Sequence, residues 1–216
     1  MKTITDRNVE LLKGQSKKQA EILSLAELWV IENNTSQILA VVEELSRVRS
    51  SGPEITIGDT KYSYGVFGGG AGQSGQAITD FLQRLIQLGF FSWKCGDSLM
   101  LKVSGRPIVV VLSNSGGTIA TVNDAKVAKK GGALVIAITS DPKSPIGEMS
   151  DLIIVLPKRK MYEESLRISK EEMECLFPLG SFPEALARYV FNVVITQLMT
   201  QLGLSERDLE KRHPDY

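Results

Sequence analysis

Two glycine- and serine-rich segments contain the residue types needed to bind an anion. Residues 68–75 read Gly-Gly-Gly-Ala-Gly-Gln-Ser-Gly, and residues 113–118 read Ser-Asn-Ser-Gly-Gly-Thr. Glycine lets backbone N–H groups approach an anion closely, hydroxyl groups donate hydrogen bonds, and the amino-terminal end of a helix carries about half a positive charge. Each segment follows an apolar run typical of a strand and precedes a helical pattern. Both are therefore candidate phosphate-binding loops.

The second loop is the more specific of the two. Glycine is common in strand-to-helix turns because tight turns need positive φ, so a plain turn explains the first loop equally well. The hydroxyls of Ser113, Ser115 and Thr118 do not help the chain to turn, and they would cost free energy if buried without partners. We therefore favour anion binding at the second loop over a solvated serine-rich loop.

The first loop also matches a dinucleotide-binding pattern. Gly70-Ala71-Gly72 followed by Gly75 spells Gly-x-Gly-x-x-Gly. That pattern requires an acidic residue about 20 residues further on, at the end of the next strand. The nearest candidate is Asp97, which follows Cys95-Gly96 in an expected loop. Because this scheme gives the second loop no role, nicotinamide binding ranks below phosphate binding.

Five short apolar runs predict the strands that position these loops: residues 62–67, 90–94, 108–113, 134–139 and 152–156. The last three are continuous β-branched and leucine runs, which are typical of strands covered on both faces. Helical patterns occupy residues 74–88 and 118–130 between the strands, and 183–202 and 205–212 after them. The alternation predicts an α/β fold with a doubly wound, flavodoxin-like, five-stranded parallel sheet flanked by helices. Ligands of such sheets bind at the carboxyl ends of the strands.

The remaining segments predict one structural domain with an amino-terminal arm. Residues 1–50 predict a helical arm that packs on the domain or on a partner subunit, with a break and a cap at residues 33–36. Residues 51–216 carry the sheet and the carboxyl-terminal helices. Within them, residues 51–61 predict a surface loop or small hairpin. The charged stretch 158–174 predicts a surface loop with a helical turn, which could act as a lid.

Composition excludes several functional classes. The chain has 216 residues, a length that predicts one domain. It has 25 Lys and Arg against 25 Asp and Glu, so we expect no positive field that would attract nucleic acid or an anionic membrane. No apolar run approaches the roughly 20 residues of a membrane-spanning helix, and residues 1–7 lack a signal core. Cys95 and Cys175 are too few for a disulfide framework and lack zinc-site spacing. We expect a cytoplasmic protein without metal.

Several segments resemble the sugar isomerase (SIS) domain family and, within it, the 6-phospho-3-hexuloisomerases. Residues 70–75 are similar to the family's Gly-Ala-Gly-Arg-Ser-Gly, with Gln73 in place of Arg. Residues 113–118 are similar to Ser-Gly-Ser-Gly-Glu-Thr, with Asn114 and Gly117 as substitutions. Three further segments are similar to family patterns. Residues 137–145 are similar to the family's Ala-Ile-Thr-Ser-Asn-Pro-x-Ser-Pro, and residues 178–184 to its Pro-Leu-Gly-Thr-x-Phe-Glu. Residues 205–213 are similar to the family's terminal segment, which ends in Arg-His. The resemblance covers about residues 62–213.

The resemblance implies a sugar phosphate isomerase that interconverts 3-hexulose 6-phosphate and fructose 6-phosphate without a metal or organic cofactor. It implies a homo-oligomer, a dimer or tetramer, with active sites completed across subunit contacts. The hydroxyls of Ser113, Ser115 and Thr118 would bind the phosphate together with Gly116, and the Gly72–Ser74 turn would lie nearby. Glu184 would be the catalytic base. His213 would carry protons between the substrate oxygens, in its own or a neighbouring subunit.

The expected chemistry needs few groups. Moving a carbonyl between C3 and C2 requires removal of a proton beside the carbonyl, an enediol, and return of the proton to the next carbon, so one carboxylate serves both steps. Glu184 follows Pro183, which predicts the first turn of a helix, and a carboxylate there is equally explained as an ordinary helix-start residue. His213, after Lys211-Arg212, is equally explained as a solvated tail.

Three functions stay open from the sequence. The first is the hexulose phosphate isomerase, the second an isomerase of a pentose or heptose phosphate, and the third a SIS protein that senses a sugar phosphate without turnover. Glu184 and His213 favour an enzyme. Gln73 and Gly117 favour a binder or an altered substrate, because they replace a cation and a carboxylate.

Overall fold

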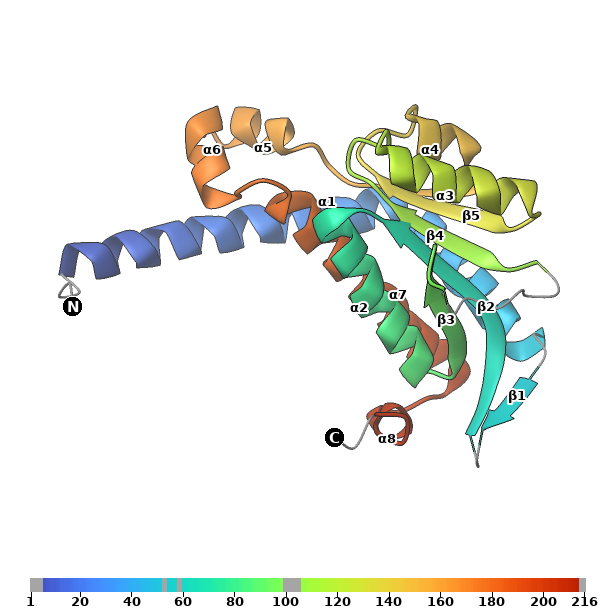
Figure 1. Ribbon diagram of the computed structural model, residues 1–216. Coiled ribbons are helices and arrows are strands. Elements are labelled where there is room, and N and C mark those ends of the chain that lie inside the picture. Colours follow the sequence, from blue (N-terminus) through green and yellow to red (C-terminus); the bar gives the residue numbers. More distant parts are fainter. Residues whose placement is uncertain (1–5, 52–53, 58–59, 99–105, 214–216) are drawn as a thin grey trace.

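The structure is a computed structural model, and it describes residues 6–51, 54–57, 60–98 and 106–213. Figure 1 shows a twisted sheet with helices on both faces and a long amino-terminal helix that extends beyond the sheet. The strands are β1 (Glu54–Ile57), β2 (Thr60–Gly70), β3 (Phe90–Lys94), β4 (Ile108–Leu112), β5 (Leu134–Thr139) and β6 (Leu152–Val155).

The five strands predicted from apolar runs form one parallel sheet in the order β3-β2-β4-β5-β6. This confirms the doubly wound, flavodoxin-like arrangement. β1 pairs antiparallel with the start of β2. Of the two structures predicted for residues 51–61, a surface loop or a small hairpin, the hairpin is therefore the one observed. The strand order reverses between β2 and β4, and the crevice at such a point is where open α/β sheets bind ligands.

The continuous apolar strands are buried on both faces because each face has its own core. In β4, Ile108, Val110 and Leu112 enter one core, whereas Val109 and Val111 enter the other. β5 alternates in the same way and is buried throughout. The first core contains the helices α1, α2 and α7, and the second contains α3 and α4 (Figure 1).

The helices are α1 (Asp6–Ser51), α2 (Gly72–Gln87), α3 (Ile119–Lys130), α4 (Pro145–Met149), α5 (Arg159–Ser165), α6 (Lys170–Leu176), α7 (Ser181–Leu202) and α8 (Glu206–Glu210). α2, α3, α7 and α8 follow the predicted helical patterns. The short α4 was not predicted. In the described part of the chain, no helix combines the length and the apolarity needed to cross a bilayer.

The predicted break in the amino-terminal arm is wrong, because α1 is continuous from Asp6 to Ser51. Asn34 is buried, and its amide nitrogen donates to Val30 O at 2.9 Å and to Val155 O at 3.0 Å. Its Oδ1 accepts from Val155 N at 2.7 Å. Thr35 bonds back to Ile31 O at 2.6 Å. These side chains therefore bond to the preceding turn and to the end of β6 while the helix continues.

The charged stretch 158–174 contains more helix than predicted. It forms α5 and the first part of α6 rather than a loop with one helical turn. Ser169 caps α6 by accepting a hydrogen bond from Glu172 N at 3.1 Å. The carboxylate of Glu172 pairs with Lys18 of α1 at 2.6 Å, so this stretch is connected to the amino-terminal helix.

Candidate active site

A cavity of about 570 Å³ opens at the carboxyl ends of three neighbouring strands. Its walls come from the segments after β4, β5 and β6 and from the turn that leads into α7: Asn114, Ser115, Ser140, Asp141, Pro157, Lys158, Arg159, Phe177, Leu179, Gly180, Phe182, Pro183 and Glu184. This size lies within the range of small-molecule sites. The sequence-predicted residues Ser115 and Glu184 meet here.

The second loop presents hydroxyl groups beside the start of α3. Ser113 Oγ is 3.0 Å from Thr118 Oγ1 and accepts a hydrogen bond from Gly116 N at 3.1 Å. One of the two hydroxyl protons in this pair is used between them, so the other can serve a ligand. Ser115 is exposed and lines the cavity. The N-cap residue of α3, Thr118, makes no side-chain capping hydrogen bond, so the positive end of the helix faces the loop.

Contacts with the segment after β5 fix the shape of the second loop. Gly116 has a φ of +67°, and a Cβ there would lie 1.8 Å from Ser144 Oγ, so only glycine fits. Ser140 donates to the Asn114 carbonyl oxygen from its hydroxyl at 2.9 Å and from its backbone N at 3.0 Å. Asn114, which differs from the family pattern, therefore lies at the junction of two loops.

The carboxylate of Glu184 is buried, with one oxygen bonded and the other unpaired. Its exposed fraction is 7%. Oε1 accepts a hydrogen bond from Ser74 Oγ at 2.9 Å. Oε2 is buried and makes no hydrogen bond within the described residues. Buried polar atoms normally have partners. Because Glu184 also lines the cavity, its carboxylate is a candidate to meet a group that enters it.

The first loop forms the turn that carries Ser74. Gly72 has a φ of +55°, and a Cβ on Gly75 would lie 2.6 Å from Gly70 O, so glycine is required at both positions. Gln73 is exposed. The structure brings Ser74 to Glu184, and no contact with the second loop is observed for its hydroxyl among the described residues.

Two basic residues of the cavity were not assigned a binding role from the sequence. Arg159 pairs with Glu163 at 3.3 Å and with Glu174 at 3.5 Å. Lys158 is exposed and makes no ion pair with a described residue. Their position in the sequence could have identified them, because both residues come shortly after the fifth predicted strand, just as each loop comes after a predicted strand. Lys158 therefore gives the cavity an uncommitted positive charge.

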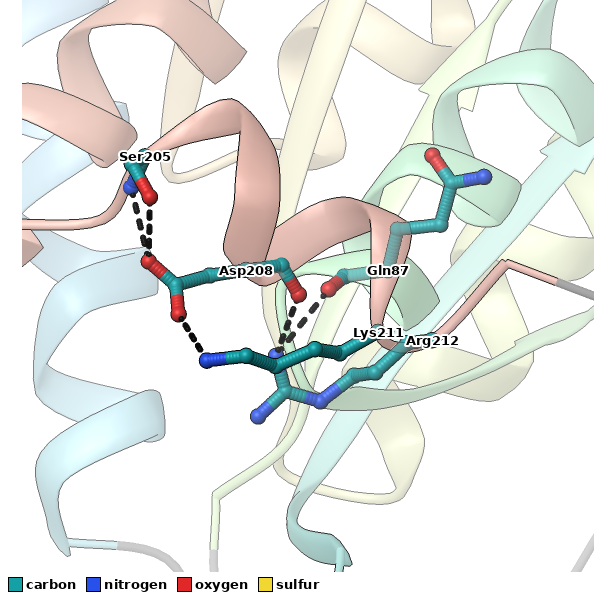
Figure 2. Close-up of polar contacts among 5 residues, drawn as sticks. All are labelled: Gln87, Ser205, Asp208, Lys211 and Arg212. Carbon is teal, nitrogen blue, oxygen red and sulfur yellow. Dashed lines mark hydrogen bonds and ion pairs between the residues drawn. The ribbon is translucent and has the colours of Figure 1, made fainter.

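The structure does not bring His213 to Glu184 within one chain. Figure 2 shows the contacts that hold α8, in which Ser205 N and Oγ donate to Asp208 Oδ2 at 3.0 and 2.7 Å and Arg212 donates to Gln87 O at 3.3 Å. The hydrogen bond from the Ser205 backbone is the main cause of a lowered Asp208 pKa. Gln87 ends α2, about 20 Å along the helix from Ser74. His213 can serve this site only from another subunit.

Cys95, directly after β3, and Asp124 of α3 interact electrostatically, and neither residue lines the cavity. Burial, followed by the charge of Asp124, raises the pKa of Cys95 to about 12. Burial also raises the pKa of Asp124, while Lys94 opposes this shift. Asp124 packs over Gly69, where a Cβ would meet its Oδ2 at 2.7 Å. In the described part of the chain, no three His, Cys, Asp or Glu side chains lie close enough to hold a metal ion.

Known proteins are similar to this chain in sequence and in fold. Residues 96–168, which include the second loop, match the SIS domain. The 3-hexulose-6-phosphate isomerase of Bacillus subtilis is 30% identical over 151 residues, covering 70% of this chain and 79% of that protein. The enzyme of the same name from Methanocaldococcus jannaschii is 31% identical over 144 residues, covering 67% and 72%.

A solved structure matches over nearly the whole chain. It is a hypothetical protein from Methanococcus jannaschii, whose crystal structure infers a function of 3-hexulose-6-phosphate isomerase. The TM-score is 0.70 at 23% identity, with 92% of this chain and 98% of that chain covered. At this identity, the likeness establishes the fold.

Proposed function

The chain belongs to the SIS domain family, and from this premise we propose that it is a sugar phosphate isomerase that interconverts 3-hexulose 6-phosphate and fructose 6-phosphate. The observation that carries the proposal is the buried Glu184 carboxylate, whose unpaired Oε2 belongs to a residue lining the same cavity as Ser115. A base and a phosphate-binding loop are two of the parts that this reaction needs.

The second loop would bind the phosphate group. Ser115 offers a hydroxyl at the cavity wall, and the Ser113–Thr118 pair offers one more proton. The uncapped start of α3 adds backbone N–H groups and a partial positive charge. Lys158 adds a full positive charge at the wall of the same cavity, which supports anion binding. This charge matters because the chain has Gln73 where the family pattern has arginine.

Glu184 would transfer the proton between the two carbons. Oε2 takes the proton from C2 of 3-hexulose 6-phosphate, which leaves an enediol across C2 and C3, and the same oxygen returns the proton to C3. The oxygen-bound proton moves from O2 to O3, so that the carbonyl ends at C2. His213 of a neighbouring subunit would carry this second proton, since an imidazole can both accept and donate a proton.

This role for His213 requires a homo-oligomer, a dimer or a tetramer. Support comes from α1, which extends beyond the sheet (Figure 1) with Leu11 61% exposed and Leu12 64% exposed. Apolar side chains on such a helix are typical of a surface covered by another chain. Sedimentation at micromolar concentration tests this, and a monomer mass would count against it.

A second candidate function is a sugar phosphate binder without turnover, or an isomerase of a pentose or heptose phosphate. Gln73 and Gly117 favour it, because both are exposed near the site and lack the charged groups of the family pattern. These two differences from the family pattern change the charge around the ligand, whereas the proposed base, Glu184, is retained.

A panel of sugar phosphates in thermal unfolding, followed by turnover assays on those that bind, tests the proposed function. A ligand at a hundredfold its dissociation constant should stabilise the protein by about 2.7 kcal/mol. We expect the largest shift and measurable turnover with 3-hexulose 6-phosphate or fructose 6-phosphate. Absence of a shift with every sugar phosphate would exclude the whole class.

A further inference from the structure

The hydroxyl of Ser74 is already committed to Glu184. Its Oγ donates to Oε1 across 2.9 Å, although 110 residues separate the two in the chain. A serine hydroxyl has one proton to donate. Ser74 therefore cannot donate to a phosphate oxygen and to the Glu184 carboxylate at the same time.

Packing between α2 and α7 holds this contact in place. Phe81 and Phe191 stack with ring centroids 4.3 Å apart. Phe81 follows Ser74 by seven residues, as Phe191 follows Glu184. The contact between Ser74 and Glu184 and the contact between Phe81 and Phe191 are therefore seven residues apart on each helix. Equal spacing on both helices means that α2 and α7 run in the same direction, and they lie side by side in Figure 1. The core therefore fixes where Ser74 meets the carboxylate.

An ion pair on the outer side of the same two helices agrees with this register. Arg188 Nε lies 3.1 Å from Asp80 Oδ2. Both side chains are partly exposed, so the pair contributes little to stability. Its value here is geometric, because Asp80 and Arg188 are 108 residues apart in the chain, close to the 110 residues that separate Ser74 from Glu184, as expected for parallel helices.

We infer that Ser74 is a positioning residue for Glu184 rather than a ligand of the substrate phosphate, an inference that rests on the proposed role of Glu184 as the base. The hydrogen bond to Oε1 stops the carboxylate from rotating. It leaves Oε2 as the oxygen that exchanges the proton with the substrate. Small displacements of a reacting group slow a reaction strongly, so the hydroxyl contributes through alignment.

Substitution of Ser74 separates a positioning role from phosphate binding. In Ser74→Ala we expect kcat to fall by about tenfold or more, while KM stays within about twofold, because the phosphate site is intact. Ser74→Thr keeps a hydroxyl and should recover most of kcat. Ser115→Ala should give the contrasting pattern, a raised KM. Thr79→Ala removes a hydroxyl that bonds to Gly75 O on the same helix, outside the site, and should change neither constant.

Proton exchange gives a second readout. The rate at which solvent deuterium enters the substrate carbon should fall in Ser74→Ala in parallel with kcat and return in Ser74→Thr. A raised KM with unchanged kcat in Ser74→Ala would make Ser74 a phosphate ligand. If kcat and KM of Ser74→Ala both equalled those of the parent protein, Ser74 would have no role in the reaction. Either result overturns the inference. By contrast, a parent protein that turns over no sugar phosphate contradicts the proposed function itself.

Discussion

Gly180 lies one helical turn before Glu184, and a Cβ at Gly180 would come within 3.1 Å of the unpaired Oε2. Gly180 also has a φ of +86°, a conformation that residues with a side chain rarely adopt. The glycine therefore allows the sharp entry into α7 and leaves space around the proposed reactive oxygen.

Gly180→Ala should affect both stability and turnover. We expect the free energy of unfolding to fall by about 1 kcal/mol from the backbone strain. We expect kcat to fall by about tenfold because the new methyl group displaces the carboxylate. Urea unfolding and steady-state kinetics measure the two effects.

Gly203→Ala is the matched control for this substitution. Gly203 ends the same helix with a φ of +63°, and a Cβ there meets nothing within 4 Å. It should lose similar stability and keep the parent kcat. Equal loss of kcat in the two variants would mean that strain alone, rather than contact with Glu184, slows the reaction.

Lys158→Gln should weaken binding of the sugar phosphate without slowing the chemical step. The side chain lines the cavity with no ion pair among the described residues, so its charge is free to attract the phosphate. We expect KM to rise by about tenfold and its dependence on salt to decrease, since screening acts on exposed charges. Lys160→Gln, which removes an exposed lysine paired with Glu164 at 3.5 Å, should leave KM unchanged. A similar rise of KM in both variants would indicate a general field instead.

The sheet could be predicted from the sequence because its evidence is local. Every residue of β4 and β5 is buried, so a continuous apolar run marks each strand closely. Position alone then places the two loops at the same edge, which is how Ser115 could be selected. The break predicted at residues 33–36 failed because Asn34 is satisfied by Val155, 121 residues away.

The site could be predicted only in part for the same reason. Ser74 was expected near the phosphate, but its contact with Glu184 depends on how α2 packs on α7. Lys158 has no residue pattern of its own, and it reaches the cavity because β6 ends beside β5. His213 stays a prediction that depends on a neighbouring subunit. Contacts between distant segments are the information that local patterns lack.

Cys95 should resist thiol reagents far better than Cys175. Burial and the charge of Asp124 raise the pKa of Cys95 to about 12, whereas Cys175 is exposed. Because the thiolate is the reactive form, the raised pKa of Cys95 makes this thiol unreactive near pH 8. Limited alkylation with iodoacetamide, followed by peptide mass spectrometry, should label Cys175 first. Equal labelling of the two in the folded protein would contradict the partly buried position of Cys95 and its raised pKa.

Glu184→Gln tests the proposed base while keeping the size of the side chain. The variant should bind sugar phosphate nearly as the parent does and lose about a hundredfold or more in turnover, because the amide cannot accept the proton. Glu206→Gln is the control, since it removes a carboxylate from the first turn of α8 and should leave turnover unchanged.

Entry of solvent deuterium into the substrate carbon measures the central claim most directly, because a base that forms an enediol can exchange its proton with water. With the parent protein in D₂O, we expect deuterium at the carbon that is deprotonated in fructose 6-phosphate. We expect the rate to fall by about a hundredfold in Glu184→Gln. Exchange at the parent rate in Glu184→Gln would contradict the role of Glu184. No exchange in the parent with any sugar phosphate that binds would favour a binder without turnover.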